Sequence, residues 1–383
     1  MSWRWSWLPF AGLLVILPYP GTVAARLLLL LLAFIFSVVW YFRATRTAWA
    51  PLPCKAAMAF WWLVGWISLA YAADPAYSLG ELKNEYGYTL LALLAFFVIG
   101  QRRETARFAL RALAAGVILL CGWACVTWLE RFDWKASAGH GDVGIVATYL
   151  VTVAPAIFLV VLGDESKTWR RIGILAGGLA LCAVVMTRQR AAWLALAIEA
   201  ALLLYLLAWT GRLPVSRRKI ALAIGVLAAT AITAVIVSTS YRIAPAGASS
   251  FDTRVEFWPS VIAQIGAYPL AGSGFGRQAM KMANSALIPG YNRQLWHAHN
   301  VVLNYGLGMG IPGILAVLSL FAVWARFFWS RATDIAGIAG CMLVAGVFLR
   351  NQFNDFFVRD MSLLFWALCG LFAGICLARR EAS

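Results

Sequence analysis

The chain has 383 residues, of which 62% are hydrophobic and only 13% are charged. Soluble globular domains carry about 25% charged residues, so this composition excludes an ordinary soluble protein and indicates an integral membrane protein. The formal net charge of +16 does not indicate nucleic-acid binding, because the sequence has no soluble basic domain. Basic residues that orient membrane spans and attract anionic lipid head groups account for that charge.

Apolar segments of about the length needed to cross a ~30 Å hydrocarbon core as helices recur along the whole chain. We count twelve, at about 5–19, 22–42, 54–73, 85–100, 108–128, 142–162, 172–187, 191–209, 220–238, 299–325, 335–350 and 358–378. The sequence therefore predicts an all-α polytopic membrane protein, with about twelve transmembrane helices in a single integral membrane domain, residues 1–383. The first segment lacks a small-residue cleavage motif, so we expect a retained helix rather than a cleaved signal peptide.

The basic residues predict how the spans are oriented. With the N-terminus in the cytoplasm, more than half of the 32 lysines and arginines fall on the cytoplasmic side, nearly all of them in short loops, for example at Arg102, Lys167 and Arg217. Both termini are then cytoplasmic. The long loop of residues 239–298, between the ninth and tenth spans, faces outward.

This long loop contains a predicted amphipathic helix. Ser249, Ser250 and Asp252 are typical of a helix start, and the helix should end before Pro269. An apolar stripe follows that start at helical spacing: Phe251, Val255, Trp258, Ile262 and Ile265. We expect this helix to lie along the bilayer surface and to shape an entrance for a lipid substrate.

Two glycine-rich stretches follow. Residues 272–276 are interpreted as a plain turn rather than a phosphate-binding loop, because no strand precedes them and no Lys-Ser/Thr pair follows. The span that begins at 299 is interrupted by Gly306, Gly308, Gly310, Pro312 and Gly313. Such a break indicates either a cavity near the outer surface or close helix packing through glycine, and the sequence leaves both open.

Two of the three histidines, His297 and His299, lie where the long loop meets the next span. A pair with one residue between can bind metal, but only with further ligands, and only His140 remains elsewhere. We therefore predict neither a metal site nor a cofactor. His299 is a candidate general base, since imidazole is mostly neutral at pH 7, whereas His297 is expected to have a structural role. Asn300 is expected to orient a substrate or to cap the helix.

Three arginines are candidates for holding an anionic group on the same side of the membrane. Arg188 and Arg190 lie in a short outward turn, against the usual charge bias, and Arg254 lies in the first turn of the loop helix. The guanidinium group suits phosphate oxygens. The alternatives are snorkelling to lipid head groups for the turn arginines, and an exposed loop charge paired with Glu256 or Asp252 for Arg254.

Weaker candidates lie at two other outer boundaries. Lys83 lies between Glu81 and Glu85, while Arg350 ends the eleventh span and Asp355 follows it. We expect these side chains to be solvated loop charges. The arginines and the histidine together suggest transfer of a group away from a pyrophosphate, whose developing charge the arginines would stabilise.

Three motifs occur together around the long loop. They are Arg190-Ala191-Ala192-Trp193-Leu194, the stretch from Arg254 through Trp258 to Pro269-Leu270-Ala271-Gly272-Ser273-Gly274-Phe275-Gly276, and His299-Asn300-Val301-Val302-Leu303 with Gly306 and Gly310-Ile311-Pro312-Gly313. In order and spacing they resemble the bacterial O-antigen ligase family, which belongs to one superfamily with the O-antigen polymerases. The motifs cover about residues 185–315, and the remainder of the chain is similar in topology.

The resemblance implies a GT-C-like helical glycosyltransferase of the bacterial inner membrane with a periplasmic active site. It would move O-antigen from undecaprenyl pyrophosphate to a sugar of lipid A–core, without metal and with inversion. By motif, Arg190 and Arg254 would bind the pyrophosphate and His299 would be the base. Arg188 follows less firmly, because many relatives have one arginine in that turn. A polymerase of the same superfamily is the nearest alternative, and a lipid-linked saccharide transporter is an alternative of another class.

Overall fold

The computed structural model describes residues 4–43, 49–131, 143–213, 251–283, 297–355 and 357–381, with a few more between 218 and 233. Every regular element in these ranges is helical. The elements are the short η1 (Arg4–Trp7), α1 (Leu8–Ile16), α2 (Val23–Arg43), α3 (Lys55–Ile67), η3 (Ser68–Tyr71), α4 (Pro75–Leu82), the π-helical η4 (Lys83–Gly87), α5 (Tyr88–Gly100), α6 (Arg103–Arg131), α7 (Val143–Gly163), α8 (Lys167–Met186), α9 (Arg190–Trp209), α11 (Phe251–Ala267), α12 (Arg277–Ala283), α13 (Val301–Trp329), α14 (Ile335–Arg350) and α15 (Arg359–Glu381).

The structure supports a polytopic helical membrane protein but not the predicted count of twelve spans. Eight helices among the described residues are long and apolar enough to cross a bilayer. The predicted spans at 5–19 and 335–350 are shorter apolar helices, Trp5–Ile16 and Ile335–Arg350. The segment at 54–73 divides into α3 and η3, and most of the segment at 220–238 lies outside the described residues. Within the part of the chain that the structure describes, apolar composition alone therefore overestimated the number of full-length spans.

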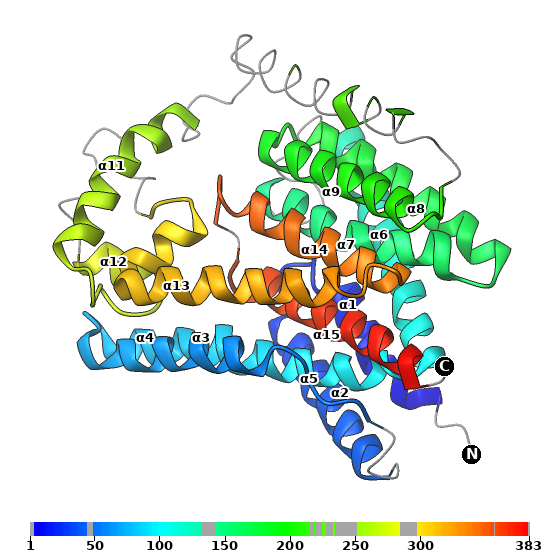
Figure 1. Ribbon diagram of the computed structural model, residues 1–383, viewed down its shortest axis with the longest axis horizontal. Helices are drawn as coiled ribbons and strands as arrows, with labels where there is room; N and C mark the ends of the chain where they lie inside the picture. The colour runs from blue at the N-terminus through cyan, green and yellow to red at the C-terminus, as the bar shows by residue number, and fades with distance from the viewer. Residues whose placement is uncertain are drawn as a thin grey trace.

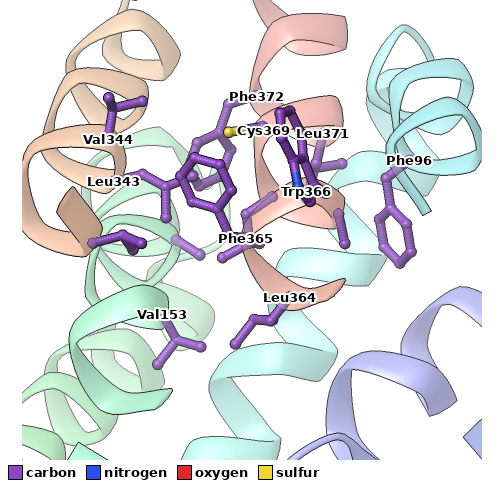
Figure 2. Packing of buried hydrophobic residues seen from close by; sticks show 14 of the residues in the cluster. Phe96, Val153, Leu343, Val344, Leu364, Phe365, Trp366, Cys369, Leu371 and Phe372 are labelled. Carbon is purple, nitrogen blue, oxygen red and sulfur yellow. The ribbon is translucent and has the colours of Figure 1, made fainter. Parts of the chain in front are cut away.

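The centre of the bundle is the pair of helices α5 and α15, which pack closely through glycine. A Cβ atom on Gly370 would lie 2.3 Å from the carbonyl oxygen of Leu93, and one on Gly374 would lie 2.4 Å from that of Phe97. This small-xxx-small spacing lets two backbones approach closely, as in many membrane helix pairs. Figure 2 shows the large side chains of α15, such as Trp366 and Phe372, between α5 on one side and α7 and α14 on the other.

The segments that the sequence assigns to the outer side lie at one end of this bundle. Ala73 donates its backbone N–H to Ser273, and Gln278 donates its backbone N–H to the hydroxyl of Tyr77. Figure 1 shows α11 and α12 at the left end of the molecule, next to the start of α13, while α15 ends near the right. These contacts agree with the prediction that the connection after η3 and the long loop lie on the same side of the bundle.

Helix α11 starts and ends as predicted, at Phe251 and before Pro269. Its buried side is formed by Phe257, Val261 and Ile265, which pack against Ala298 and Leu307. Two members of the predicted stripe, Val255 and Ile262, are instead exposed. The predicted stripe was therefore only partly correct. The side of α11 that packs against α13 carries Phe257 and Val261, which the stripe did not include. The position of α11 relative to the bilayer stays a prediction.

The glycine-rich break in α13 is a kink at Gly310, whose φ of 66° and ψ of −157° are not helical. The turn at 269–276 packs into this kink. Ser273 and Gly274 donate backbone hydrogen bonds of 3.0 and 2.9 Å to the carbonyl oxygens of Leu307 and Gly308. A Cβ atom on Gly310 would lie 2.5 Å from the carbonyl oxygen of Pro269.

The sequence left two interpretations open for the glycine-rich stretch at 306–313, a cavity and close packing through glycine, and the structure contains both. The backbone packs closely at the kink, and a cavity of about 200 Å³ lies beside it, lined by Gln264, Tyr268, Ser273 and Gly306 among others. The predicted plain turn at 272–276 is also observed, outside any regular element.

Candidate functional site

The candidate site is organised around the connection between α14 and α15, residues 351–355. Each backbone carbonyl of 351, 352 and 353 accepts a hydrogen bond from a candidate segment. The donors are the Val301 N–H at 2.8 Å, the Asn300 side-chain amide at 3.1 Å, and the guanidinium of Arg254. This connection, which we name the 351–355 loop, therefore holds the start of α13 and the first turn of α11 together.

His299 lies two residues before the first residue of α13 and is buried, with 8% of its surface exposed. Its φ of 51° is in the left-handed region, where few residues other than glycine are found. The side-chain Nδ1 lies 3.0 Å from the amide oxygen Oδ1 of Asn354, in the 351–355 loop. Because an amide oxygen only accepts hydrogen bonds, this contact requires the tautomer of the neutral ring in which Nδ1 carries the proton and the basic lone pair is on Nε2.

His297 lies beside this ring. Its Nδ1 accepts the backbone N–H of His299 at 3.1 Å, and the two ring centroids are 3.8 Å apart. Burial, followed by the charges of His299, Arg277 and Arg254, holds the pKa of His297 well below its usual range. His297 is therefore neutral at pH 7, and the structural role expected for it stays a prediction.

Asn300 is the N-cap of α13. Its side-chain oxygen accepts the N–H of Leu303 at 3.0 Å, while its side-chain nitrogen donates to the carbonyl oxygen of Gln352. Both ends of the amide are thus engaged in structural hydrogen bonds. Of the two roles predicted for Asn300, the structure provides direct support for the helix cap.

Arg254 extends from the first turn of α11 and donates to the carbonyl oxygen of Phe353. Burial lowers the pKa of Arg254 to about 10, so the guanidinium stays charged at neutral pH. Of the two acidic partners that the sequence suggested for Arg254, Glu256 is exposed, and the side chain of Asp252 lies outside the described residues. Arg254 and His299 therefore contact neighbouring residues, Phe353 and Asn354, of the same loop.

Asp355 is buried, with 3% of its surface exposed, so the prediction of a solvated loop charge was wrong for this residue. The Asn304 side chain donates to its carboxylate, and Arg277 lies 3.6 Å from the same carboxylate and donates to the Asp355 backbone carbonyl. Arg277 was not among the predicted site residues. Burial in a membrane protein leaves Asp355 dependent on these partners, because an unpaired buried charge is costly.

A pocket of about 30 Å³, enough for a water molecule, lies beside this pair. It is lined by Glu85, Arg277, Asn304, Tyr305 and Asp355, among others. The prediction at this boundary named Lys83, but Lys83 is exposed, whereas Glu85 and Glu81 are buried. Glu81 pairs with Arg359 at 3.2 Å. The π-helical turn η4 thus presents the carboxylate of Glu85, and not Lys83, toward the site.

Arg350 is almost completely buried, with 1% exposed, and this also contradicts the prediction of a solvated charge. Its guanidinium lies within hydrogen-bonding distance of the Gly144 carbonyl at 3.3 Å and of the Gln189 side chain at 3.5 Å. Gln189 separates Arg188 and Arg190. Arg350 therefore joins the turn between α8 and α9 to the end of α14, immediately before the 351–355 loop.

Arg188 and Arg190 differ in their settings. Arg188 is exposed and has a left-handed φ of 54°, while Arg190 is half-buried at the first residue of α9. The contact between Gln189 and Arg350 brings their turn to the same end of the bundle as His299. His140, the third histidine, lies outside the described residues.

In chemical terms, the site combines a neutral imidazole with several guanidinium groups at one end of a membrane bundle. Guanidiniums bind anionic oxygens, and an imidazole with its lone pair on Nε2 accepts a proton. Within the described ranges, no group of three or more His, Cys, Asp or Glu side chains is arranged to hold a metal ion.

Comparison with protein families identifies the segment that carries these residues. Residues 175–318 match the family model described as O-antigen ligase, and this segment, under half of the chain, runs from within α8 to within α13. It includes Arg188, Arg190, Arg254, His297 and His299. The 351–355 loop lies outside it. The match supports membership of the O-antigen ligase superfamily, as the motifs indicated. No curated protein matches the chain.

Proposed function

We propose that this member of the O-antigen ligase superfamily is an O-antigen ligase of lipopolysaccharide biosynthesis. Its donor is O-antigen linked to undecaprenyl pyrophosphate, its acceptor is a sugar hydroxyl of lipid A–core, and its site faces the periplasm from the bacterial inner membrane. The observation that carries this proposal is the meeting of His299 and Arg254 on adjacent residues of the 351–355 loop. A proton acceptor and a cation for a pyrophosphate are the two groups that such a transfer requires.

The transfer is a single displacement. The acceptor hydroxyl oxygen attacks the anomeric carbon, the bond from that carbon to the pyrophosphate oxygen breaks, and undecaprenyl pyrophosphate leaves with the bonding electron pair. The hydroxyl proton passes to Nε2 of His299 and then to solvent. An in-line displacement without an enzyme nucleophile inverts the anomeric configuration.

The arginines stabilise the negative charge that develops on the leaving group. Arg254 and Arg190 bind the pyrophosphate, with Arg188 as a further contact from the rim of the same turn. These fixed charges take the role that a divalent metal ion has in many other pyrophosphate-dependent enzymes, and the reaction proceeds without metal. General-base assistance contributes about 10²–10⁴-fold to such a rate, so leaving-group stabilisation supplies much of the remainder.

An O-antigen polymerase of the same superfamily is the second candidate. It would use the same base and arginines but a second lipid-linked glycan as the acceptor. A saccharide transporter is less well supported, because a transporter would not require a proton acceptor with a fixed tautomer at the end of the bundle.

Reconstitution in liposomes with lipid-linked O-antigen and lipid A–core tests the proposal. Transfer to lipid A–core should persist in the presence of a chelator, and loss of transfer on chelation would contradict the metal-independent mechanism. Longer glycans that remain attached to the lipid pyrophosphate would identify a polymerase. Movement of the donor across the bilayer without any new glycosidic bond would identify a transporter.

Substitution of the base separates chemistry from binding. His299→Ala should abolish transfer while lipid-linked donor still binds, because the imidazole acts on the acceptor proton. His299→Ala protein that transferred at the normal rate would remove His299 from the mechanism.

A further inference from the structure

We propose that Asn354 and His297 are positioning residues that hold His299 in the one tautomer and orientation in which Nε2 accepts the acceptor's proton. This inference rests on the function proposed above for His299. Neither Asn354 nor the role of His297 follows from the O-antigen ligase match, and Asn354 lies outside the matched segment.

Asn354 determines the tautomer. Its amide oxygen lies 3.0 Å from Nδ1 of His299 and accepts the ring N–H, so the proton stays on Nδ1 and the lone pair on Nε2. In the opposite tautomer, two acceptors would face each other at this distance. An amide is also neutral, and this matters for the charge of the ring. A carboxylate in its place would stabilise the imidazolium form and raise the pKa of His299, so fewer rings would accept a proton at pH 7.

His297 determines the backbone and ring orientation. A backbone N–H only donates, so the His299 N–H at 3.1 Å requires an unprotonated Nδ1 on His297. The two neighbouring histidines therefore hold opposite tautomers, with the proton on Nε2 of His297 and on Nδ1 of His299. The same bond stabilises the left-handed φ of His299, and the His297 ring covers the face of the His299 ring at a centroid distance of 3.8 Å.

The loop that carries Asn354 is itself fixed from both sides. The carbonyl of Asn351 accepts from Val301, and the carbonyls of Gln352 and Phe353 accept from Asn300 and Arg254. These bonds tie the loop to the start of α13, two residues after His299. Asn354 and His299 therefore keep their relative position as one unit, as a positioning contact must.

The charged groups around this pair come from five segments of the chain. His297 lies on the same segment, Arg254 on α11, Arg277 on α12 and Asp355 in the 351–355 loop, with Glu85 of η4 beside Arg277 and Asp355 in the small pocket. Both arginines lower the pKa of His297 and so disfavour a charged ring on that residue. A new carboxylate at position 354 would contact Nδ1 directly and would outweigh these more distant charges.

The test compares four variants in liposomes: Asn354→Asp, Asn354→Leu, His297→Asn and His297→Leu. For Asn354→Asp, the acid limb of the kcat profile should move to higher pH by about one unit or more, since a carboxylate now stabilises the protonated ring. Asn354→Leu should lower kcat by about 10-fold or more with little change in the donor KM. His297→Asn supplies a side-chain oxygen that accepts the N–H two residues on, so it should retain more activity than His297→Leu.

A second measurement does not depend on transfer. Diethyl pyrocarbonate modifies neutral imidazole, and fragment mass spectrometry distinguishes modification of His299 from that of His297. The pH midpoint for modification of His299 should rise in Asn354→Asp protein, and thermal unfolding in detergent shows which variants are folded. An unchanged midpoint and an unchanged kcat profile in folded Asn354→Asp protein would overturn the role of Asn354. Equal activity of His297→Asn and His297→Leu would overturn that of His297.

The two hypotheses fail in different ways. If His299→Ala protein transfers normally, the proposed base is wrong, whereas the modification midpoint still reports whether Asn354 controls the His299 ring. If His299→Ala is inactive but the Asn354 variants keep the wild-type pH dependence, the base stands and the positioning inference is wrong.

Discussion

The indole N–H of Trp258 donates a hydrogen bond of 2.9 Å to the carbonyl oxygen of Ala298, the residue between the two histidines. Ala298 is fully buried under α11, where it packs with Phe257 and Val261. Its N–H is bound as well, by the side-chain oxygen of Asn304 at 2.8 Å. The His297–His299 segment is therefore held on one side by α11, through Trp258, and on another by α13, through Asn304.

Trp258→Phe should weaken this attachment. Phenylalanine keeps an aromatic ring at this position, but the Ala298 carbonyl loses its donor, at a cost of about 0.5–1.5 kcal/mol. We expect transfer to fall several-fold with a small decrease in melting temperature, because the histidine segment is held less firmly. Trp209→Phe, at an exposed position at the far end of α9, is the matched control and should leave both quantities unchanged. Equal transfer rates for the two variants would contradict a positioning role for α11.

Arg254→Lys should weaken donor binding even though it keeps the charge. Lysine cannot both reach the Phe353 carbonyl and present a planar pair of N–H groups to a phosphate. We expect the donor Kd to rise by about 10-fold, and further for Arg254→Ala.

Arg212→Lys is the control for this loss. Arg212 also donates to a backbone carbonyl, that of Thr333 at 2.8 Å, but it lies on the predicted cytoplasmic side. Donor binding measured with a labelled lipid-linked glycan should be unchanged in Arg212→Lys. If Arg254→Lys binds donor as tightly as this control, the guanidinium geometry is irrelevant.

The pair of Arg277 and Asp355 should act as one unit. Asp355→Asn leaves Arg277 near the site without its counter-charge, and Arg277→Gln leaves a buried carboxylate supported by Asn304 and the backbone N–H of Phe357. Each single variant should lower kcat/KM, and the double variant should be no worse than the poorer single one. The resulting coupling free energy is about 1–3 kcal/mol. Strict additivity of the two losses would show that the residues act separately.

Sequence patterns located the long helices well but not the short ones. The unbroken apolar runs of α7, α8 and α9 predict those helices to within a few residues. The predicted span at 85–100 began too late, because its helix extends back through η4 and α4 to Pro75, where Asp74 caps the start by accepting the N–H of Tyr77 at 2.9 Å. An apolar count does not detect this Asp-Pro helix start. The same count read the 16-residue α14 as a complete span.

The candidate site was predictable only where local motifs mark it. His299, Asn300 and Arg254 stand in recognisable motifs, but Asn354 reaches His299 across 55 positions of sequence. The spacing of residues within a motif cannot predict a contact between residues so far apart in the sequence. The one available signal was composition, since four of the five residues at 351–355 are polar between two apolar helices. The burial of Arg350 and Asp355 could not be predicted, because it depends on partners in other helices.

Gly374→Val should destabilise the fold without touching the candidate site. A Cβ atom there would lie 2.4 Å from the Phe97 carbonyl oxygen, which is backbone and cannot rotate away. Separation of α5 and α15 should cost about 1–3 kcal/mol or more and lower the melting temperature in detergent. Gly178→Val on α8, where nothing lies within 4 Å of the added carbon, is the control and should be neutral. Equal melting temperatures would show that α5 and α15 tolerate wider spacing.

The ion pair of Arg111 and Asp164, at the end of the bundle opposite the histidines, should make stability depend on pH. Burial alone would raise the pKa of Asp164, but the hydrogen bonds from Arg111, two of 2.7 Å, outweigh it and hold that pKa below the usual 3.8. A carboxyl with a depressed folded pKa stabilises the fold above its unfolded pKa and loses that contribution as pH falls through the folded value.

Asp164→Asn should therefore lower the melting temperature at pH 7, by the equivalent of about 1–3 kcal/mol. The difference from the wild type should shrink as the pH falls below about 4, where the wild-type carboxyl also becomes neutral. Glu165→Gln is the matched control, because Glu165 is exposed and its pairs with Arg103 and Arg107 are screened by solvent, so its effect should be much smaller. A difference between Asp164→Asn and the wild type that stayed constant from pH 7 to pH 3 would show that the lost stability comes from packing and not from the charge of Asp164.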